Sequence, residues 1–361
     1  MADIISIASA VPENCHLQND ILKFMQESYQ LDETDKRKLA FLYNKSGINT
    51  RYSAISDFSI QKKDRTFIPV QSDAPFPSLE KRMAVYEAAA LPLSIEAINR
   101  CIKGHIEPKA ITHLITISCT GMSAPGLDLA IMEQLQLASN TNRTSVNFMG
   151  CYAAIHGLKI AKGICDNTPG ANVVMVATEL CTLHFQKEFT HENAASSLLF
   201  ADGAAAVLIN NHTASGQKCS LQNFYSEVVF KGKNEMSWQL SSNGFLMSLS
   251  GYIPQLIEED IAQLTENALK QSGLTKKDIT HWCIHPGGRK IIDVIQSKLE
   301  LSDDAVSFSR NILAQYGNMS SPTILFVLNE ILKEVQNTPA TIFGIAFGPG
   351  LTMETFIVST K

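Results

Sequence analysis

A cysteine, a histidine and an asparagine each stand in a sequence context that suits acyl transfer. Cys151 follows an apolar run and a glycine and opens a helix of small residues, His285 precedes Pro-Gly-Gly, and Asn318 follows a glycine. A thiol at a helix N-terminus beside an imidazole is expected to ionise readily and act as a nucleophile. Imidazole and amide groups can both donate to a carbonyl oxygen that becomes negative. The three residues together predict carbon–carbon bond formation from a thioester.

Each of these residues also has a structural alternative. His285 could be a turn histidine whose ring is bonded to backbone, and Asn318 could be a plain helix N-cap. The eight cysteines show no C-x-x-C pair and no regular spacing, so neither a disulfide framework nor a metal site is expected. Buried cysteines commonly serve as small core residues, and only Cys151 has the Gly-Cys strand-to-helix setting of a nucleophile.

Composition favours a soluble, cytoplasmic enzyme. The chain has 361 residues and a net charge of −5, without a long Lys/Arg-rich run, so neither nucleic acid nor an anionic membrane is expected as a partner. The apolar start, Met1 to Pro12, lacks the basic residues of a signal peptide and predicts a first buried strand. No uninterrupted apolar run approaches the roughly 18 residues that span a bilayer.

The elements around the three residues recur in the same order in both halves of the chain. Each half has a helix-like stretch, a strand that starts Ile-Thr-His, a helix that begins at Gly-Cys151 or Gly-Asn318 and ends at Asn-Thr-Pro, and a further strand. We therefore predict an α/β protein with an internal duplication. A pseudo-twofold axis would bring Cys151, His285 and Asn318 to one centre. The predicted halves are 1–211 and 221–361, joined by a polar linker at 212–220; the repeated elements are 84–100, 110–121, 151–169 and 171–178, then 257–271, 278–287, 318–339 and 340–346.

Several motifs together resemble one enzyme family. They are Gly-Cys151, His285-Pro-Gly-Gly288, Gly-Asn318-Met-Ser-Ser321, Phe200-Ala-Asp-Gly203, Ala124-Pro-Gly126 and Phe347-Gly-Pro-Gly-Leu351. The chain resembles a type III polyketide synthase of the chalcone and stilbene synthase family. The resemblance implies the thiolase fold, with two duplicated halves and mixed sheets layered against helices as α-β-α-β-α. It also implies a homodimer.

The resemblance implies a role for each of the three residues. Cys151 would accept the acyl group of an acyl-CoA starter, and His285 would hold the thiol as thiolate before attack. Asn318 with His285 would stabilise the enolate that malonyl-CoA forms when it loses carbon dioxide. Coenzyme A thioesters would be substrates, with neither a metal nor a redox cofactor, and the product would be a small polyketide of the pyrone, resorcinol or phloroglucinol type.

Other positions matched to the family concern the cavity and its mouth. Trp238 stands at a wall glycine of the family and Met247 at its second gatekeeping phenylalanine, which predicts a small or narrow product. Ala124 falls where a methionine of the family crosses to the partner subunit. The other positions implied to border the cavity are Phe200 at its mouth, Cys119, Cys181, His184 and Ser320. The implied coenzyme A contacts are Lys38 and Lys45, while Phe41 stands at the family's third basic position and cannot bind a phosphate. Arg289 and Lys290 could supply the missing phosphate contact, or they could be solvent-facing residues at a helix start.

Two other functions remain open on the sequence. An initiating ketoacyl-acyl-carrier-protein synthase shares the three residues and the fold but takes its extender from a carrier protein. A catalytically silent scaffold could also have kept the fold, although an intact Cys151, His285 and Asn318 argues against it. The sequence leaves open the starter, the number of extensions, the mode of cyclisation and whether a carrier protein delivers the starter.

Overall fold

The computed structural model describes residues 2–69, 74–212, 219–336 and 338–361. Nine strands form one hydrogen-bonded sheet in the order β11-β12-β13-β8-β1-β7-β6-β4-β5. Their bounds are β1 Asp3–Ala10, β4 His113–Ser118, β5 Asn142–Asn147, β6 Asn172–Leu180, β7 Asp202–Asn210, β8 Cys219–Val228, β11 His281–Ile284, β12 Ala340–Gly348 and β13 Thr352–Thr360.

The strand order is mirrored about the junction of β1 and β8. In the first half β1 pairs antiparallel with β7, β7 antiparallel with β6, and β6 parallel with β4. In the second half β8, β13, β12 and β11 repeat the same sequence of directions. The halves join where Asp3 pairs with Ser220. This mirrored order is what the predicted internal duplication requires.

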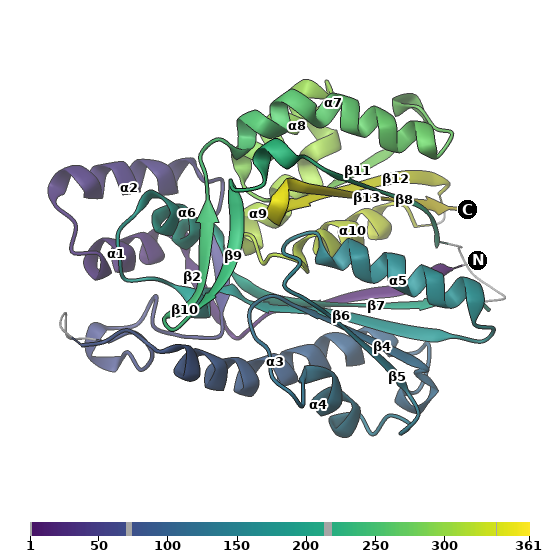
Figure 1. Cartoon of the computed structure of the whole chain (residues 1–361), viewed down its shortest axis with the longest axis horizontal. Helices are drawn as coiled ribbons and strands as arrows, with labels where there is room; N and C mark the ends of the chain where they lie inside the picture. The colour runs from purple at the N-terminus through teal and green to yellow at the C-terminus, as the bar shows by residue number, and fades with distance from the viewer. Residues whose placement is uncertain (1, 70–73, 213–218, 337) are drawn as a thin grey trace.

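Helices complete five layers. α3 (Leu79–Ile102) and α4 (Leu127–Gln134) cover the outer face of the first half, and α7 (Ile253–Gln271) and α8 (Arg289–Lys298) cover that of the second (Figure 1). α5 (Ala153–Asn167) and α10 (Thr323–Glu334) lie between the two parts of the sheet (Figure 1). The expected α-β-α-β-α layering is confirmed. Most of the expected linker, 213–218, lies outside the described residues, and its last two residues already belong to β8.

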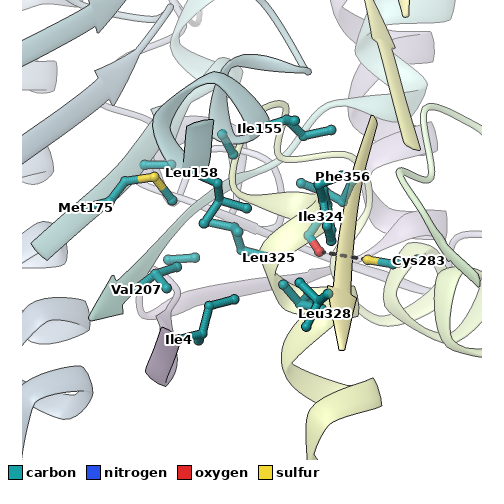
Figure 2. Packing of buried hydrophobic residues seen from close by; sticks show 14 of the residues in the cluster. Ile4, Ile155, Leu158, Met175, Val207, Cys283, Ile324, Leu325, Leu328 and Phe356 are labelled. Atoms are coloured by element: carbon teal, nitrogen blue, oxygen red, sulfur yellow. Dashed lines mark hydrogen bonds between the residues drawn. The ribbon is translucent and has the colours of Figure 1, made fainter. Parts of the chain in front are cut away.

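The middle layer is a tightly packed apolar core. Ile155 and Leu158 of α5 pack with Ile324 of α10 between Met175 of β6 and Phe356 of β13 (Figure 2). The helix α5 approaches its sheet most closely at Gly157, where a Cβ would lie 2.3 Å from Sδ of Met175. Such interiors tolerate little displacement, so the starts of α5 and α10 are held rigidly relative to each other.

Several of the remaining elements gather at one end of the molecule. α1, α2, α6, β2 and the β9–β10 hairpin lie together at the left of Figure 1. None of the described helices is long and apolar enough to cross a bilayer. The bounds are β2 Asn14–Leu17, α1 Gln18–Ser28, α2 Glu33–Lys45, β3 Thr50–Ser53, α6 His191–Leu199, β9 Met236–Ser241, β10 Gly244–Leu249 and α9 Ser307–Tyr316, with 3-10 turns at Lys62–Asp64, Pro108–Ala110, Cys181–His184, Phe230–Gly232, Lys276–Asp278, Asp304–Val306 and Pro349–Leu351.

Candidate active site

Cys151, His285 and Asn318 border one cavity of about 880 Å³. Cys151 lies in the turn before α5, His285 directly follows β11, and Asn318 comes after α9. Their residues are 8%, 4% and 2% exposed, so each reaches the cavity from a buried position. The fold therefore brings together the three residues that the sequence singled out, and their catalytic roles remain predictions.

The turn that carries Cys151 depends on the glycine before it. Gly150 has a φ of +81°, and a Cβ there would lie 2.2 Å from Cδ of Pro349. Any other residue would strain the backbone and collide with the neighbouring turn. The N–H of Gly150 donates to Sγ of Cys119 at 3.0 Å, so a second thiol lies directly behind the candidate nucleophile.

The electrostatics of Cys151 differ from the sequence-based expectation of an acidic thiol. Burial raises the pKa of Cys151 to about 11, because the hydrogen bonds of Ser320 and Asn318 do not offset the desolvation and Glu179 adds to the rise. Burial also lowers the pKa of His285 to about 3. Burial therefore favours the neutral thiol and the neutral imidazole, in contrast to the expectation from the helix N-terminus, which begins at Ala153.

The ring of His285 has no hydrogen-bond partner among the described residues. Both Nδ1 and Nε2 are buried and unpaired, while the backbone N–H donates to the carbonyl of Ile345 at 2.8 Å. The alternative of a turn histidine bonded to backbone through its ring is therefore wrong. Buried polar groups are nearly always paired, so two free ring nitrogens beside a cavity indicate a place for a substrate group.

Asn318 is oriented by the turn in which it lies. Its Oδ1 accepts the N–H of Ser320 at 2.8 Å, while its side-chain amide interacts with the Cys151 thiol and Nδ2 makes a long contact of 3.4 Å with the carbonyl of Gly287. The N-cap of α10 is Pro322, so the plain N-cap alternative is also wrong. The weakly engaged Nδ2 remains able to donate to a substrate oxygen.

An aromatic cluster forms one wall of the cavity. The indole N–H of Trp238 donates to the carbonyl of Cys119 at 2.6 Å. His184 donates from Nε2 to the carbonyl of Thr120 at 2.7 Å and accepts the N–H of Phe245 at Nδ1 at 3.0 Å. Burial lowers the pKa of His184 to about 3, and its ring stacks on Phe245 at 4.3 Å between centroids. His184 is thus a neutral wall residue with both ring nitrogens occupied.

The other predicted positions divide by location. Lys38 does not border the cavity: it is exposed on α2 and pairs with Asp35 at 2.9 Å. Phe41 is exposed and also lies outside the lining. The remaining predicted positions border the cavity, namely the buried Cys181 and Ser320, the half-buried Phe200 and Met247, and the exposed Lys45, Arg289 and Lys290.

Two buried charged residues beside the site were not predicted. Glu179 of β6 accepts the N–H of Cys119 at 2.9 Å and the hydroxyls of Thr120 and Ser321, both at 2.8 Å, and burial raises its pKa to about 7. A carboxylate inside an apolar strand is a sequence signal that could have indicated it. Arg51 of β3 also borders the cavity, and its short polar strand carries no comparable signal.

Comparison with known proteins finds one family across both halves of the chain. Residues 1–213 match the model of the N-terminal domain of chalcone and stilbene synthases, and residues 219–360 match that of the C-terminal domain. Type III polyketide synthases C and A of Arabidopsis thaliana are each 28% identical, over 99% of this chain and 94% and 92% of theirs.

Solved structures extend the comparison to the fold. The crystal structure of PKS-I from the brown alga Ectocarpus siliculosus superposes with a TM-score of 0.93 at 29% identity, covering 100% of this chain and 98% of that one. The C-terminal type III domain of Steely1, a type I/III hybrid from Dictyostelium, has a TM-score of 0.90 at 22% identity and 99% coverage of both chains, which shows the fold alone. With both family domains matched across nearly its whole length, the chain belongs to the chalcone and stilbene synthase family of type III polyketide synthases, which are acyl-transferring, condensing enzymes.

Proposed function

We propose that this enzyme loads an acyl-CoA starter on Cys151, decarboxylates malonyl-CoA and condenses iteratively to a small polyketide. The observation that carries the proposal is the pair of unpaired imidazole nitrogens of His285, next to the same cavity as Cys151 and the weakly engaged amide of Asn318. A neutral thiol can pass its proton to a neutral imidazole as the sulfur attacks a bound thioester.

Loading replaces one thioester with another. Sγ of Cys151 attacks the carbonyl carbon of the starter while His285 accepts the thiol proton. The bond from that carbon to the sulfur of coenzyme A breaks, and His285 returns the proton to the departing thiolate. Because each charged form alone is disfavoured by burial, the transfer is expected to proceed only as the thiolate and imidazolium form together.

Extension begins with decarboxylation of malonyl-CoA. The bond between its methylene carbon and the carboxylate breaks, and the electron pair passes into an enolate whose oxygen accepts hydrogen bonds from His285 and Asn318. The enolate carbon attacks the acyl carbon on Cys151, and the sulfur leaves as thiolate. The chain, two carbons longer and now on coenzyme A, can then reload. These steps require neither a metal nor a redox cofactor.

The exposed side of the cavity suits the phosphates of coenzyme A. Lys45, Arg289 and Lys290 border it, and the last two open α8, where free N–H groups also favour an anion. Arg289 lies against Gly47, because a Cβ on Gly47 would be 3.4 Å from Cδ of Arg289. Arg289 therefore approaches the end of α2 that carries Lys45. We assign the phosphate contacts to this group of cations rather than to Lys38.

The wall formed by Trp238 supports a small or narrow product. Its indole is fixed by the bond to the Cys119 carbonyl and packs edge-on against both His184 and Phe245. A fixed ring takes up room that a growing chain would otherwise use. The proposal is a pyrone, resorcinol or phloroglucinol-type product made by a cytoplasmic homodimer.

The test is turnover with malonyl-CoA and a panel of acyl-CoA starters, read as product masses, with Cys151→Ala as the control. Products without any carrier protein would support the proposal. Condensation only when malonyl-acyl-carrier protein is supplied would indicate the initiating ketoacyl synthase instead. Absence of both malonyl decarboxylation and Cys151 acylation would indicate a silent scaffold.

A further inference from the structure

We propose that Arg51 is a positioning residue that fixes the backbone segments of Phe200 and Asn318 relative to each other during the reaction. This inference rests on the proposed function. Arg51 lies on β3 and is only 3% exposed. Its Nη1 donates to the carbonyl oxygen of Phe200 at 2.6 Å, and its Nε donates to Oε1 of Gln18 at 2.8 Å. The guanidinium is therefore bonded directly to the backbone of the residue at the cavity mouth.

The aliphatic part of the same side chain packs against the segment that carries Asn318. Gly317 has a φ of +71°, and a Cβ there would lie 2.8 Å from Cγ and 2.9 Å from Cδ of Arg51. The absence of a side chain at this position lets Arg51 pass directly beneath the backbone that precedes Asn318. One side chain thus contacts both the Phe200 segment and the Asn318 segment.

These two segments are also bonded to each other. The N–H of Asn318 donates to the carbonyl of Leu199, and the N–H of Ala201 donates to the carbonyl of Asn318, both at 2.9 Å. Two backbone hydrogen bonds alone form a short bridge that can open easily. Arg51 fixes the Phe200 carbonyl on one side of this bridge and supports Gly317 on the other.

If Arg51 served only to stabilise the fold, a buried cation would be a poor choice at this position. Nη2 of Arg51 is buried and makes no hydrogen bond of good geometry within the described part of the chain, and the neutral hydroxyl of Tyr43 is the group that interacts with the guanidinium most strongly. The oxygens of Asp202, which interacts with Arg51, already accept the N–H groups of Ala54 and Thr182 and the Thr182 hydroxyl. Burying an incompletely paired charge is costly, and an apolar residue of similar size would avoid that cost. An apolar residue could not, however, donate a hydrogen bond to the Phe200 carbonyl.

The proposal predicts two linked effects when this hold is lost. A looser Asn318 amide stabilises the enolate less well, which slows decarboxylation of malonyl-CoA. A looser Phe200 excludes water from the mouth less well, so the acyl group on Cys151 is hydrolysed more often before it is extended. The ratio of free acid to condensed product reports this second effect and does not depend on the fraction of enzyme that is folded.

The experiment compares Arg51→Met with Arg82→Met. Arg82 is an equally buried arginine whose partners are the carbonyls of Pro77 and Leu183, away from the bridge. Amide hydrogen exchange of Ala201 and Asn318 should be at least tenfold faster in Arg51→Met than in the wild type, and unchanged in Arg82→Met. The ratio of free acid to condensed product should rise at least threefold in Arg51→Met.

Wild-type exchange at both amides together with a wild-type product ratio in folded Arg51→Met would overturn the proposal. If that variant does not fold, Arg51→Lys takes its place, because one ammonium cannot bond Gln18 and Phe200 in the geometry of the planar fork. Exchange at least threefold faster is expected there, and unchanged exchange would overturn the proposal. Exchange needs no turnover, so a wild-type enzyme that fails to decarboxylate malonyl-CoA would refute the proposed function separately.

Discussion

The backbones of Phe200 and Asn318 pair as an isolated parallel bridge. Phe200 ends α6 in the first half of the chain and Asn318 follows α9 in the second, so the bridge joins the two halves beside the cavity. The bridge therefore links the backbone of Phe200, whose ring is predicted to lie at the mouth, to the residue whose amide is proposed to bind the enolate oxygen. Under the proposed function, this bridge connects water exclusion with charge stabilisation.

The first prediction concerns the nucleophile. Cys151→Ala should lower condensation by at least about a thousandfold, because no acyl-enzyme can form, and it should leave the fold intact. Cys165→Ala is the matched control, since it removes a buried thiol from α5 that does not border the cavity. Product formation is measured by mass spectrometry with circular dichroism as the check on folding. Wild-type product levels from Cys151→Ala would remove Cys151 from the mechanism.

The second prediction separates decarboxylation from condensation. Cys151→Gln should still release carbon dioxide from malonyl-CoA, because His285 and Asn318 remain to stabilise the enolate. Adding Asn318→Ala to that variant should lower carbon dioxide release by about a hundredfold, as expected for one lost oxyanion donor. The assay is release of labelled carbon dioxide. Equal release from the single and double variants would contradict the role of Asn318.

The third prediction concerns acid stability. Burial lowers the pKa of His285 from 6.5 to about 3, so between these values the unfolded chain binds a proton that the folded chain does not. The contribution of neutral His285 to stability is therefore present above pH 6.5 and is lost as the pH falls toward 3. From pH 7.5 to pH 5 the wild type should lose about 2 kcal/mol more than His285→Gln does.

Urea unfolding of both proteins at several pH values provides the measurement. Only the difference between the two curves is informative, because burial also raises the pKa of Glu179 to about 7 and that of Asp202 to about 6, which acts in the opposite direction over part of this range. Parallel curves for the wild type and His285→Gln would show that the imidazole is not held neutral by burial.

The sequence was most informative where local geometry demands particular residues. Gly150 before Cys151 and Gly317 before Asn318 both have positive φ, and the elements that follow them recur in each half. It was therefore predictable from the sequence that Cys151 and Asn318 would meet at one cavity. The ionisation of Cys151 was not, because desolvation depends on tertiary packing that a helix-terminus argument ignores. Arg51 contacts Phe200 and Gly317, which are 149 and 266 positions away in the chain, and no local sequence pattern indicates such contacts.

The fourth prediction is a homodimer. β5 is an edge strand of the sheet with mostly exposed residues, and Met122 and Leu129 are exposed nearby in the chain. Open edges and exposed apolar side chains are commonly covered in the functional assembly. Light scattering at micromolar concentration should give twice the chain mass of 39.6 kDa. Met122→Glu should weaken the dimer if this face is the interface, and a monomeric wild type would contradict the prediction.

The last prediction concerns the cavity wall. Trp238→Gly removes the indole and leaves the Cys119 carbonyl without its donor, so stability should fall by about 2 kcal/mol or more. The space released lies beside His184 and Phe245, and longer starters or additional extensions should then be accepted while malonyl-CoA decarboxylation persists. Trp238→Phe is the comparison variant, because it keeps an aromatic ring while it removes the hydrogen bond and only part of the indole's volume. Product masses from a series of acyl-CoA starters distinguish the two variants. Larger products from Trp238→Gly but not from Trp238→Phe would assign the limit to the space that the aromatic ring fills, and the wild-type product range from Trp238→Gly would show that this wall does not set product size.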